Sequence, residues 1–223
     1  MRSDLVLHGY DASSYVFTVR ILLAEKGADH ERVPVHVLAG EARAPGHLAL
    51  HPFGKVPVLV HDGVRIIETS AITRYLNDVL DGPSFVPDNA VDRARMDMAI
   101  GIYDSYGYAA MAEIVGYHRF PEFVGNPGRD ALDASVARMH AVLAETMRIR
   151  GHSAFIAGER PSLADFHLAP ACFYLDLVED GGRVFDVPGF DEWWWNVRQR
   201  PGYRAAVPDL ERVLVRSPDT RPA

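Results

Sequence analysis

Hydrophobic positions along the first eighty residues alternate between the periods of strands and helices. Leu5 to His8 predicts a short strand, and Tyr15 to Lys26 predicts a helix that ends at Gly27. The alternation over His30 to Val37 predicts a second strand. A loop that carries Gly40, Pro45 and Gly46 follows. This order predicts a βαβ unit.

A hairpin and a helix are expected next. Pro57 to His61 and Val64 to Glu68 are apolar runs joined by Asp62-Gly63, a dipeptide that favours a two-residue hairpin turn. A helix from Thr69 or Ser70 to about Leu80 closes the unit. The order βαβ, then ββα, is that of a thioredoxin-like domain. We place this domain at residues 1–82 and a linker at residues 83–89.

Beyond Asn89 only the helical period remains. The predicted helices cover about 90 to 118, 130 to 150, 162 to 179 and 190 to 200. Ser162-Leu163-Ala164-Asp165 resembles a capping box with Asp in place of Glu, which sets the start of a central helix. The predicted fold class is therefore α+β followed by α, with an all-helical bundle domain over residues 90–223.

Charge and composition restrict the possible partners. The 223 residues carry a net charge of -7, and Lys and Arg are scattered, so we expect no nucleic-acid partner. No charge-free apolar run reaches the roughly 20 residues of a membrane helix, and no leader precedes the first strand, so we expect a cytoplasmic protein without membrane association. The single cysteine, Cys172, cannot form an internal disulfide, and within its apolar helix it is expected to pack.

Two serines, Ser13 and Ser14, stand where the first strand leads into the first helix. A hydroxyl at a helix N-terminus can help to hold an anion. The same residues can also serve only as the N-cap of that helix. The residues alone leave both interpretations open.

Four motifs together point to a family. His51-Pro-Phe-Gly-Lys-Val-Pro57 is similar to the Asn-Pro-Phe-Gly-Lys/Gln-Val-Pro segment of phi-class glutathione transferases, and Glu68-Thr-Ser-Ala-Ile72 is similar to their Glu-Ser-Arg-Ala-Ile. Ser162 to Asp165 resembles the family's folding-signal cap, and Gly189 to Pro201 resembles its Trp-Trp…Arg-Pro ending. The chain thus resembles the cytosolic glutathione transferases, particularly the serine-type phi, theta and zeta classes.

The resemblance implies a catalytic serine. Ser13 falls on the family's catalytic position, Ser14 is the close alternative, and Tyr10 in the first loop is another possible thiol donor. Ser13-Ser14 with Val19-Arg20-Ile21 is also similar to the zeta isomerase motif Ser-Ser-Cys-x-x-x-Val-Arg-Ile, but Tyr15 stands where that class has cysteine.

The resemblance also implies a glutathione site. A cis bond between Val56 and Pro57 would let the Val56 backbone pair with the cysteinyl part of glutathione, as an added strand does. Glu68 would bind the ammonium group of the ligand, and Thr69 with the helix amides its α-carboxylate. Arg43 and Lys55 are candidate partners of the glycine carboxylate, although each can equally be a solvated cation. Ala42 stands where phi sequences often have histidine.

The electrophile is expected between the two domains. Candidate contacts are aromatic and apolar residues near one face of the first long helix, together with a tyrosine of the first loop: Tyr103, Tyr106, Ala110, Ile114, Tyr117 and Tyr10. A stripe at this spacing can also be core. The resemblance implies a homodimer, and it does not indicate which residues form the interface.

The implied function is a glutathione S-transferase that conjugates reduced glutathione to apolar electrophiles through a thiolate stabilised by serine. The alternatives are a glutathione-dependent isomerase or dehalogenase of the zeta kind, or a noncatalytic binding relative. No metal is expected, because His47 and His51 have the spacing of ligands but no third ligand follows in a metalloenzyme pattern. The sequence does not indicate the natural electrophile.

Overall fold

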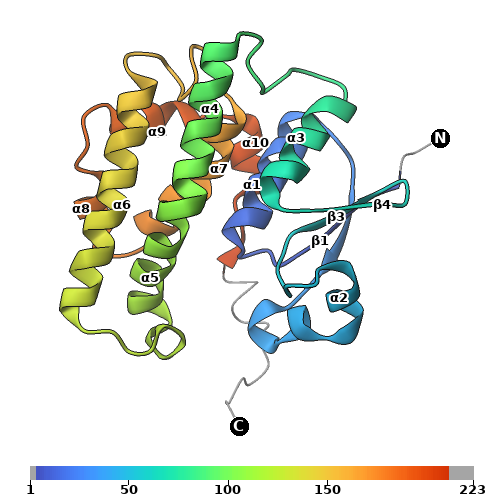
Figure 1. Ribbon diagram of the computed structural model, residues 1–223, viewed down its shortest axis with the longest axis horizontal. Coiled ribbons are helices and arrows are strands. Elements are labelled where there is room, and N and C mark those ends of the chain that lie inside the picture. The colour runs from blue at the N-terminus through green and yellow to red at the C-terminus, as the bar shows by residue number, and fades with distance from the viewer. Residues whose placement is uncertain (1–3, 211–223) are drawn as a thin grey trace. The chain divides into compact units, whose positions relative to one another are not determined.

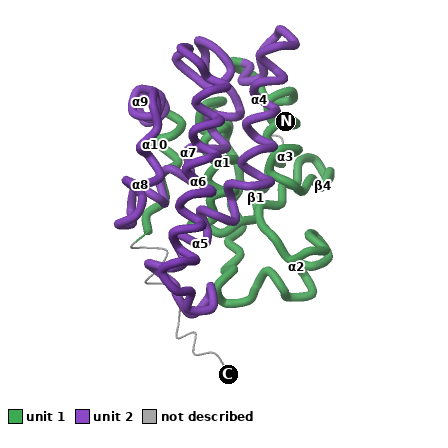
Figure 2. Tube along the Cα trace, turned by 60° about the vertical axis from the view of Figure 1, so that its left-hand side comes forward, with its two compact units in different colours: residues 1–83, 201–223 green, residues 84–200 purple. Residues whose placement is uncertain are grey.

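The computed structural model describes residues 4–210. This part of the chain forms two compact units, one of residues 4–83 with 201–210 and the other of residues 84–200 (Figure 2).

The first unit contains a four-stranded sheet and its helices (Figure 1). Its elements are β1 Leu5–Gly9, α1 Ser14–Glu25, β2 Glu31–Pro34, the 3-10 turns η1 Val37–Ala39 and η2 Glu41–Arg43, α2 Pro45–Leu50, β3 Val58–His61, β4 Val64–Ile67, α3 Thr69–Val79 and α10 Pro201–Ala206. The strand order is β2-β1-β3-β4, with β1 parallel to β2 and the other pairs antiparallel. The predicted βαβ-ββα order is confirmed.

Local sequence explains the strands and their turn. Leu5 and Leu7 of β1 are buried, whereas the alternate residues Val6 and His8 are only half-buried, as the alternation predicts. The turn between β3 and β4 places Asp62 at φ 47° and Gly63 at φ 79°. Two consecutive left-handed residues match the right-handed twist of a hairpin, and Asp-Gly tolerates them well.

The segment before this hairpin differs from its prediction. The strand expected over His30 to Val37 covers only Glu31–Pro34 and ends opposite Gly9, the last residue of its partner β1. The expected loop with Gly40, Pro45 and Gly46 contains η1, η2 and the helix α2. Pro45 lies in the first turn of α2, where its missing N–H costs nothing. Elements of three to six residues are too short to show a period.

Helix α10 belongs to the first unit although it comes last among the described elements. It packs on α1: the Gly202 N–H donates to Glu25 Oε1 at 2.9 Å, and the rings of Phe17 and Tyr203 lie 5.7 Å apart. The predicted helices end at residue 200, so α10 was not predicted.

The second unit is helical throughout its described elements. These are α4 Ala90–Ile102, the π segment η3 Tyr103–Gly107, α5 Tyr108–Arg119, the 3-10 turn η4 Pro121–Val124, α6 Arg129–Arg150, α7 Leu163–Asp176, α8 Gly181–Phe185 and α9 Phe190–Arg198. The helix expected over 90 to 118 is present but is interrupted by η3, and those expected over 162 to 179 and 190 to 200 are shorter. The five-residue helix α8 was not predicted.

Helix α7 is the centre of this unit. The predicted capping box is confirmed, because the Asp165 carboxylate accepts bonds from the Ser162 N–H at 2.7 Å and the Ser162 hydroxyl at 2.8 Å. It also accepts from the Ile156 N–H at 3.0 Å and the Trp193 indole N–H at 2.7 Å. Burial raises the pKa of Asp165, and these donors oppose that effect.

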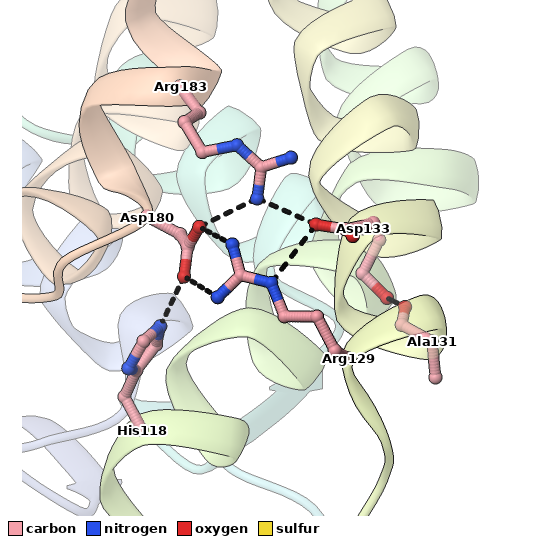
Figure 3. A network of polar contacts seen from close by, with 7 residues as sticks. His118, Arg129, Ala131, Asp133, Asp180 and Arg183 are labelled. Carbon is pink, nitrogen blue, oxygen red and sulfur yellow. Dashed lines mark hydrogen bonds and ion pairs between the residues drawn. The ribbon is translucent and has the colours of Figure 1, made fainter.

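A second polar cluster joins three helices of this unit (Figure 3). The Asp180 carboxylate, before α8, accepts from His118 at the end of α5 at 3.0 Å, and from Arg129 and Arg183 at 2.9 and 2.7 Å. Asp133 on α6 also accepts from Arg183 at 2.8 Å and lies 3.4 Å from Arg129. We call these five residues the Asp180 cluster.

Cys172 lies in α7 and is fully buried, as predicted. Burial raises the pKa of its thiol well above the usual value, which keeps the thiol protonated and unreactive. Among residues 4–210, no helix combines the length and the apolarity that crossing a membrane requires.

Candidate functional site

Three segments of the first unit meet at one edge of its sheet. His8 near the end of β1 lies opposite Val58 at the start of β3, and Val58 lies opposite Ile67 at the end of β4. The chain that leaves β1, enters β3 and leaves β4 is therefore gathered at this edge. These segments are residues 10–13, 56–57 and 68–69, three of those that the sequence marked for glutathione.

Ser13 is the N-cap residue of α1. Its backbone is extended, with φ -76° and ψ 127°, and its Oγ accepts a long hydrogen bond of 3.4 Å from the Val16 N–H. A tight turn places it there, because the Ser13 N–H donates to the Tyr10 carbonyl at 2.9 Å. A hydroxyl that accepts through a lone pair keeps its proton for a second partner. Capping and donation to an anion are therefore compatible at Ser13.

Ser14 occupies the first turn of α1 and is buried. Its carbonyl accepts from the Thr18 hydroxyl at 3.3 Å. Ser13 is half-buried and lies at the helix end, so it is the more accessible of the two.

The peptide bond between Val56 and Pro57 is cis, as predicted. Within residues 4–210, neither the N–H nor the C=O of Val56 makes a backbone hydrogen bond. The Lys55 backbone is held by a side chain, because its carbonyl oxygen lies 2.8 Å from His47 Nε2. A backbone donor and acceptor in this position suit an extended peptide ligand.

Glu68 leads into α3 with an unusual backbone, at φ 70° and ψ 122°. Its carboxylate does not cap the helix, and the residue is exposed. The Thr69 carbonyl accepts from the Thr73 hydroxyl at 2.9 Å within α3. The first-turn amides of a helix have no partner within that helix, so the positive end of α3 and a carboxylate are available at the same edge.

The Arg43 side chain lies against Gly54, the residue before Lys55. A Cβ added to Gly54 would lie 3.0 Å from Arg43 Cδ and 3.2 Å from its Nε, so the arginine stem runs along the backbone next to Lys55. Gly54 also has φ 61°, which only glycine adopts easily. Both cations are exposed.

Two buried histidines shape this region, a role that the sequence reasoning missed. His47 binds the Lys55 carbonyl, and the rings of His47 and His51 stack at 6.5 Å. Burial lowers the pKa of His51, so its imidazole is neutral at pH 7. Their i, i+4 spacing in the sequence is also that of metal ligands on one helical face, and it does not indicate the contact with the Lys55 carbonyl. Among residues 4–210, no group of three or more His, Cys, Asp or Glu side chains has a metal-binding arrangement.

The candidate electrophile contacts have different surroundings. Tyr103, Ala110 and Ile114 are buried, Tyr117 is half-buried, and Tyr106 is 66% exposed. The π segment holds an extra residue that shifts the helical register between Tyr103 and Ala110. The role of these residues as electrophile contacts stays a prediction.

Tyr10, in the turn before Ser13, is buried, with its ring 6.4 Å from that of His36. Burial, followed by the charge of Asp11, raises the pKa of its hydroxyl. This hydroxyl therefore remains a neutral donor at pH 7.

The mixed sheet, with its βαβ-ββα order and the polar groups at one edge, defines the first unit as a thioredoxin-like domain, followed in sequence by a helical domain. Comparison with known proteins gives the family. The model of the glutathione S-transferase N-terminal domain matches residues 5–78, and that of the C-terminal domain matches residues 129–214. The chain belongs to the glutathione S-transferase family.

Individual relatives come from two classes. Glutathione S-transferase F14 of Arabidopsis thaliana is 34% identical over 195 residues, 82% of this chain and 75% of the relative. Maleylacetoacetate isomerase of Rhizobium meliloti (strain 1021) is 32% identical over 178 residues, 78% and 82% of the two chains. The crystal structure of glutathione transferase F7 from Populus trichocarpa is similar with a TM-score of 0.80 at 28% identity, covering 91% of this chain and 97% of that one.

One structure of the same fold contains a glutathione derivative. It is glutathione S-transferase-I bound with lactoylglutathione, with a TM-score of 0.80 at 23% identity, covering 92% of this chain and 98% of that one.

Proposed function

We propose that this protein is a glutathione transferase in which Ser13 stabilises the thiolate of bound glutathione for attack on an apolar electrophile. The observation that carries the proposal is the convergence of Ser13, Val56-Pro57 and Glu68-Thr69 at one edge of the sheet. Each group matches one part of the tripeptide. Ser13 faces the sulfur, the Val56 backbone pairs with the cysteinyl unit, and Glu68 with Thr69 binds the γ-glutamyl ammonium and carboxylate.

The two cations complete the ligand. Arg43 lies along Gly54 beside Lys55, so the chain offers two positive charges to the glycine carboxylate. Ala42 stands where phi sequences often have histidine, so that contact to the ligand is absent here.

The energetics of thiolate formation are within reach of these groups. Lowering a thiol pKa from about 8.5 by about two units requires roughly 2.7 kcal/mol of preferential stabilisation. A hydrogen bond to a charged group contributes roughly 1.5–3 kcal/mol, and a helix N-terminus roughly 0.3–1 kcal/mol. Ser13 acts as a donor and keeps its proton. The thiolate forms the carbon–sulfur bond, and the leaving group departs with the electron pair.

The second candidate function is glutathione-dependent isomerisation. It is favoured by the maleylacetoacetate isomerase relative and by Ser13-Ser14 with Val19-Arg20-Ile21. Tyr15, in place of the cysteine of that motif, argues against it. In an isomerase the thiolate would add to a cis-dienone and leave again after bond rotation, so both functions need the same activated sulfur. A haloacid as substrate would indicate a dehalogenase.

Two further expectations belong to this proposal. The electrophile is apolar, with Tyr10, Tyr106 and Tyr117 as candidate contacts. The protein is a homodimer, which sedimentation of the purified chain would measure directly.

The test compares Ser13→Ala with the native protein. We expect the pKa of bound glutathione to rise by about one to two units, because about 1.5–3 kcal/mol of hydrogen bonding to the thiolate is lost. The ultraviolet absorbance of the thiolate, titrated in the complex, measures this pKa. Turnover of a chloronitrobenzene near neutral pH is expected to fall roughly 10- to 100-fold.

Ser14→Ala is the matched control, and it is expected to leave the thiol pKa close to native. A larger effect at Ser14 than at Ser13 would reassign the donor. Binding of glutathione without thiolate in the native protein would favour a noncatalytic relative. Thiolate without conjugation, but with turnover of a cis-dienone, would favour the isomerase.

A further inference from the structure

Three charged side chains meet beside the turn that carries Ser13. The Asp11 carboxylate lies in that turn, 3.9 Å from Arg20 Nη1 of α1 and in direct contact with Arg32 of β2. The Arg20 side chain is only 13% exposed, whereas Asp11 and Arg32 are 40% and 45% exposed. The three charges sum to +1, and the most deeply buried of them is a cation.

Geometry puts the Arg20 guanidinium near the helix end that holds Ser13. Residues 13 and 20 are seven positions apart, which is nearly two whole turns, so they share a face of α1. Long side chains on a helix lean toward its N-terminus. The contact with Asp11 shows that Arg20 does so, since the Cα atoms of residues 11 and 13 can be at most about 7.6 Å apart.

We propose that Arg20 favours the thiolate form of bound glutathione through its positive charge, and that the Asp11 carboxylate offsets part of this effect. This inference rests on the proposed function, since it needs a thiolate at Ser13. Arg20 acts at a distance, without bonding to the sulfur. It adds a fixed charge to the helix N-terminus and the hydroxyl.

Burial decides which charge matters most. A partly buried ion is screened by salt far less than an exposed one, so Arg20 outweighs the exposed Arg32. At a separation of roughly 8–10 Å and an effective dielectric constant between those of surface pairs and bulk water, one charge changes the thiolate equilibrium about three- to tenfold.

The test removes a positive charge in one variant and a negative charge in the other, both from the same group of ion pairs. Arg20→Gln is expected to lower the thiolate-to-thiol ratio of bound glutathione about three- to tenfold at a given pH. Asp11→Asn is expected to raise the ratio, because the negative charge that offsets Arg20 is lost while the largely buried Arg20 side chain stays confined by its surroundings. The readout is the absorbance titration of the complex, with the glutathione dissociation constant measured alongside.

Opposite signs distinguish a charge effect from a structural one. If the ion pairs served only to hold the turn in place, both variants would lower the ratio together, and that result would overturn the proposal. Unchanged ratios in both variants would also overturn it. Arg20→Lys keeps the charge and is expected to stay within about twofold of native, so the proposal is still decided by Arg20→Lys and Asp11→Asn if Arg20→Gln does not fold.

Arg204→Gln is the matched control. Arg204 is an exposed arginine of α10, which packs at the other end of α1, and its loss is expected to leave the ratio unchanged. A native protein that binds no glutathione, or binds it only as the thiol, overturns the proposed function and this inference with it. A native thiolate that does not respond to the Asp11 and Arg20 variants overturns this inference alone.

Discussion

Glu68 holds a backbone conformation that few residues other than glycine adopt. At φ 70° and ψ 122° its Cβ crowds its own backbone, which costs of order 1–3 kcal/mol. The surrounding structure supplies that energy, because Ile67 before it is paired with β3 and the Ile72 N–H after it donates to the Glu68 carbonyl at 2.9 Å. The strain places an exposed carboxylate at the N-terminus of α3, where the proposed ammonium partner is needed.

Replacing Glu68 by glycine and by alanine separates strain from binding. Neither variant has a carboxylate, so both are expected to bind glutathione more weakly. Glu68→Gly relieves the strain and is expected to be more stable than Glu68→Ala by about 1 kcal/mol, measured by urea unfolding. Equal stability of the two variants would show that the backbone at residue 68 relaxes, and unchanged affinity would remove Glu68 from the site.

At this scale the sequence predicted residue identities better than conformations. Sequence motifs predict Ser13, Val56-Pro57 and Glu68-Thr69 as site residues, and the structure brings these segments to one edge of the sheet. The positive φ of Glu68 could not be predicted, because nothing local favours it and tertiary pairing imposes it. The role of His47 at the Lys55 carbonyl depends on a contact across a turn, which the spacing of histidines does not show.

At the scale of elements, the Asp180 cluster holds the end of α5 and the start of α6 to the segment before α8 (Figure 3). Burial alone would raise the pKa of Asp180. Hydrogen bonds from Arg183 and His118, with the charge of Arg129, outweigh burial and lower this pKa below its usual value. Asp180 therefore stabilises the fold in its ionised form.

The pH dependence of this contribution has a definite sign. A carboxylate whose folded pKa is depressed adds stability that is complete above its unfolded pKa of about 3.9, and this stability is lost as pH falls through the folded value. Asp180→Asn is therefore expected to cost about 1–3 kcal/mol near pH 6, with the difference from native shrinking below about pH 4. Urea midpoints at several pH values measure it.

Asp186→Asn is the control for this experiment, since Asp186 is exposed and lies a few residues away. Its effect on stability is expected to stay within about 0.5 kcal/mol. A cost at Asp180 that did not change between about pH 6 and about pH 3 would contradict the charge-based account, because below the unfolded pKa of about 3.9 the unfolded chain binds a proton at this carboxyl and the stabilisation from the depressed folded pKa declines.

Long periodic elements were predicted well, and short or distorted ones were not. α6 and the β3–β4 hairpin match their predicted ranges closely, because many residues or a specific turn dipeptide carry the signal. α2 and α8 have only six and five residues. The π segment at Tyr103–Gly107 changes the helical register, and it contains no Pro that would indicate a distortion from the sequence.

At the scale of the whole molecule, the last described helix, α10, packs on the first helix, α1. The first unit is therefore assembled from residues far apart in the sequence. The amphipathic pattern of a helix shows which face it buries but not against which partner, so this closure was beyond sequence reasoning. It also means that α1, the helix capped by Ser13, packs against residues after 200.

At Gly202 the backbone of α10 lies so close to α1 that a substitution can test the packing. A Cβ there would lie 2.4 Å from Glu25 Cγ and 2.7 Å from the Ile21 carbonyl oxygen, and a backbone oxygen cannot move aside without distorting α1. Gly202→Ala is therefore expected to destabilise the protein by about 1–3 kcal/mol. Gly101→Ala in α4 is the matched control. No neighbour lies within 4 Å of its added Cβ, so it is expected to be neutral or up to about 1 kcal/mol stabilising.

Amide hydrogen exchange locates the effect of Gly202→Ala within the molecule. If α10 stabilises α1 locally, exchange in the Ile21 to Glu25 segment should accelerate by a larger factor than exchange in α6. Equal acceleration in α1 and α6 would mean that the unfolding is global and that this contact contributes only to overall stability. Measuring glutathione affinity tests whether the effect reaches the N-terminus of α1. If local opening of α1 spreads to Ser13, Gly202→Ala should weaken binding although residue 202 packs at the opposite end of that helix, whereas Gly101→Ala should leave binding unchanged.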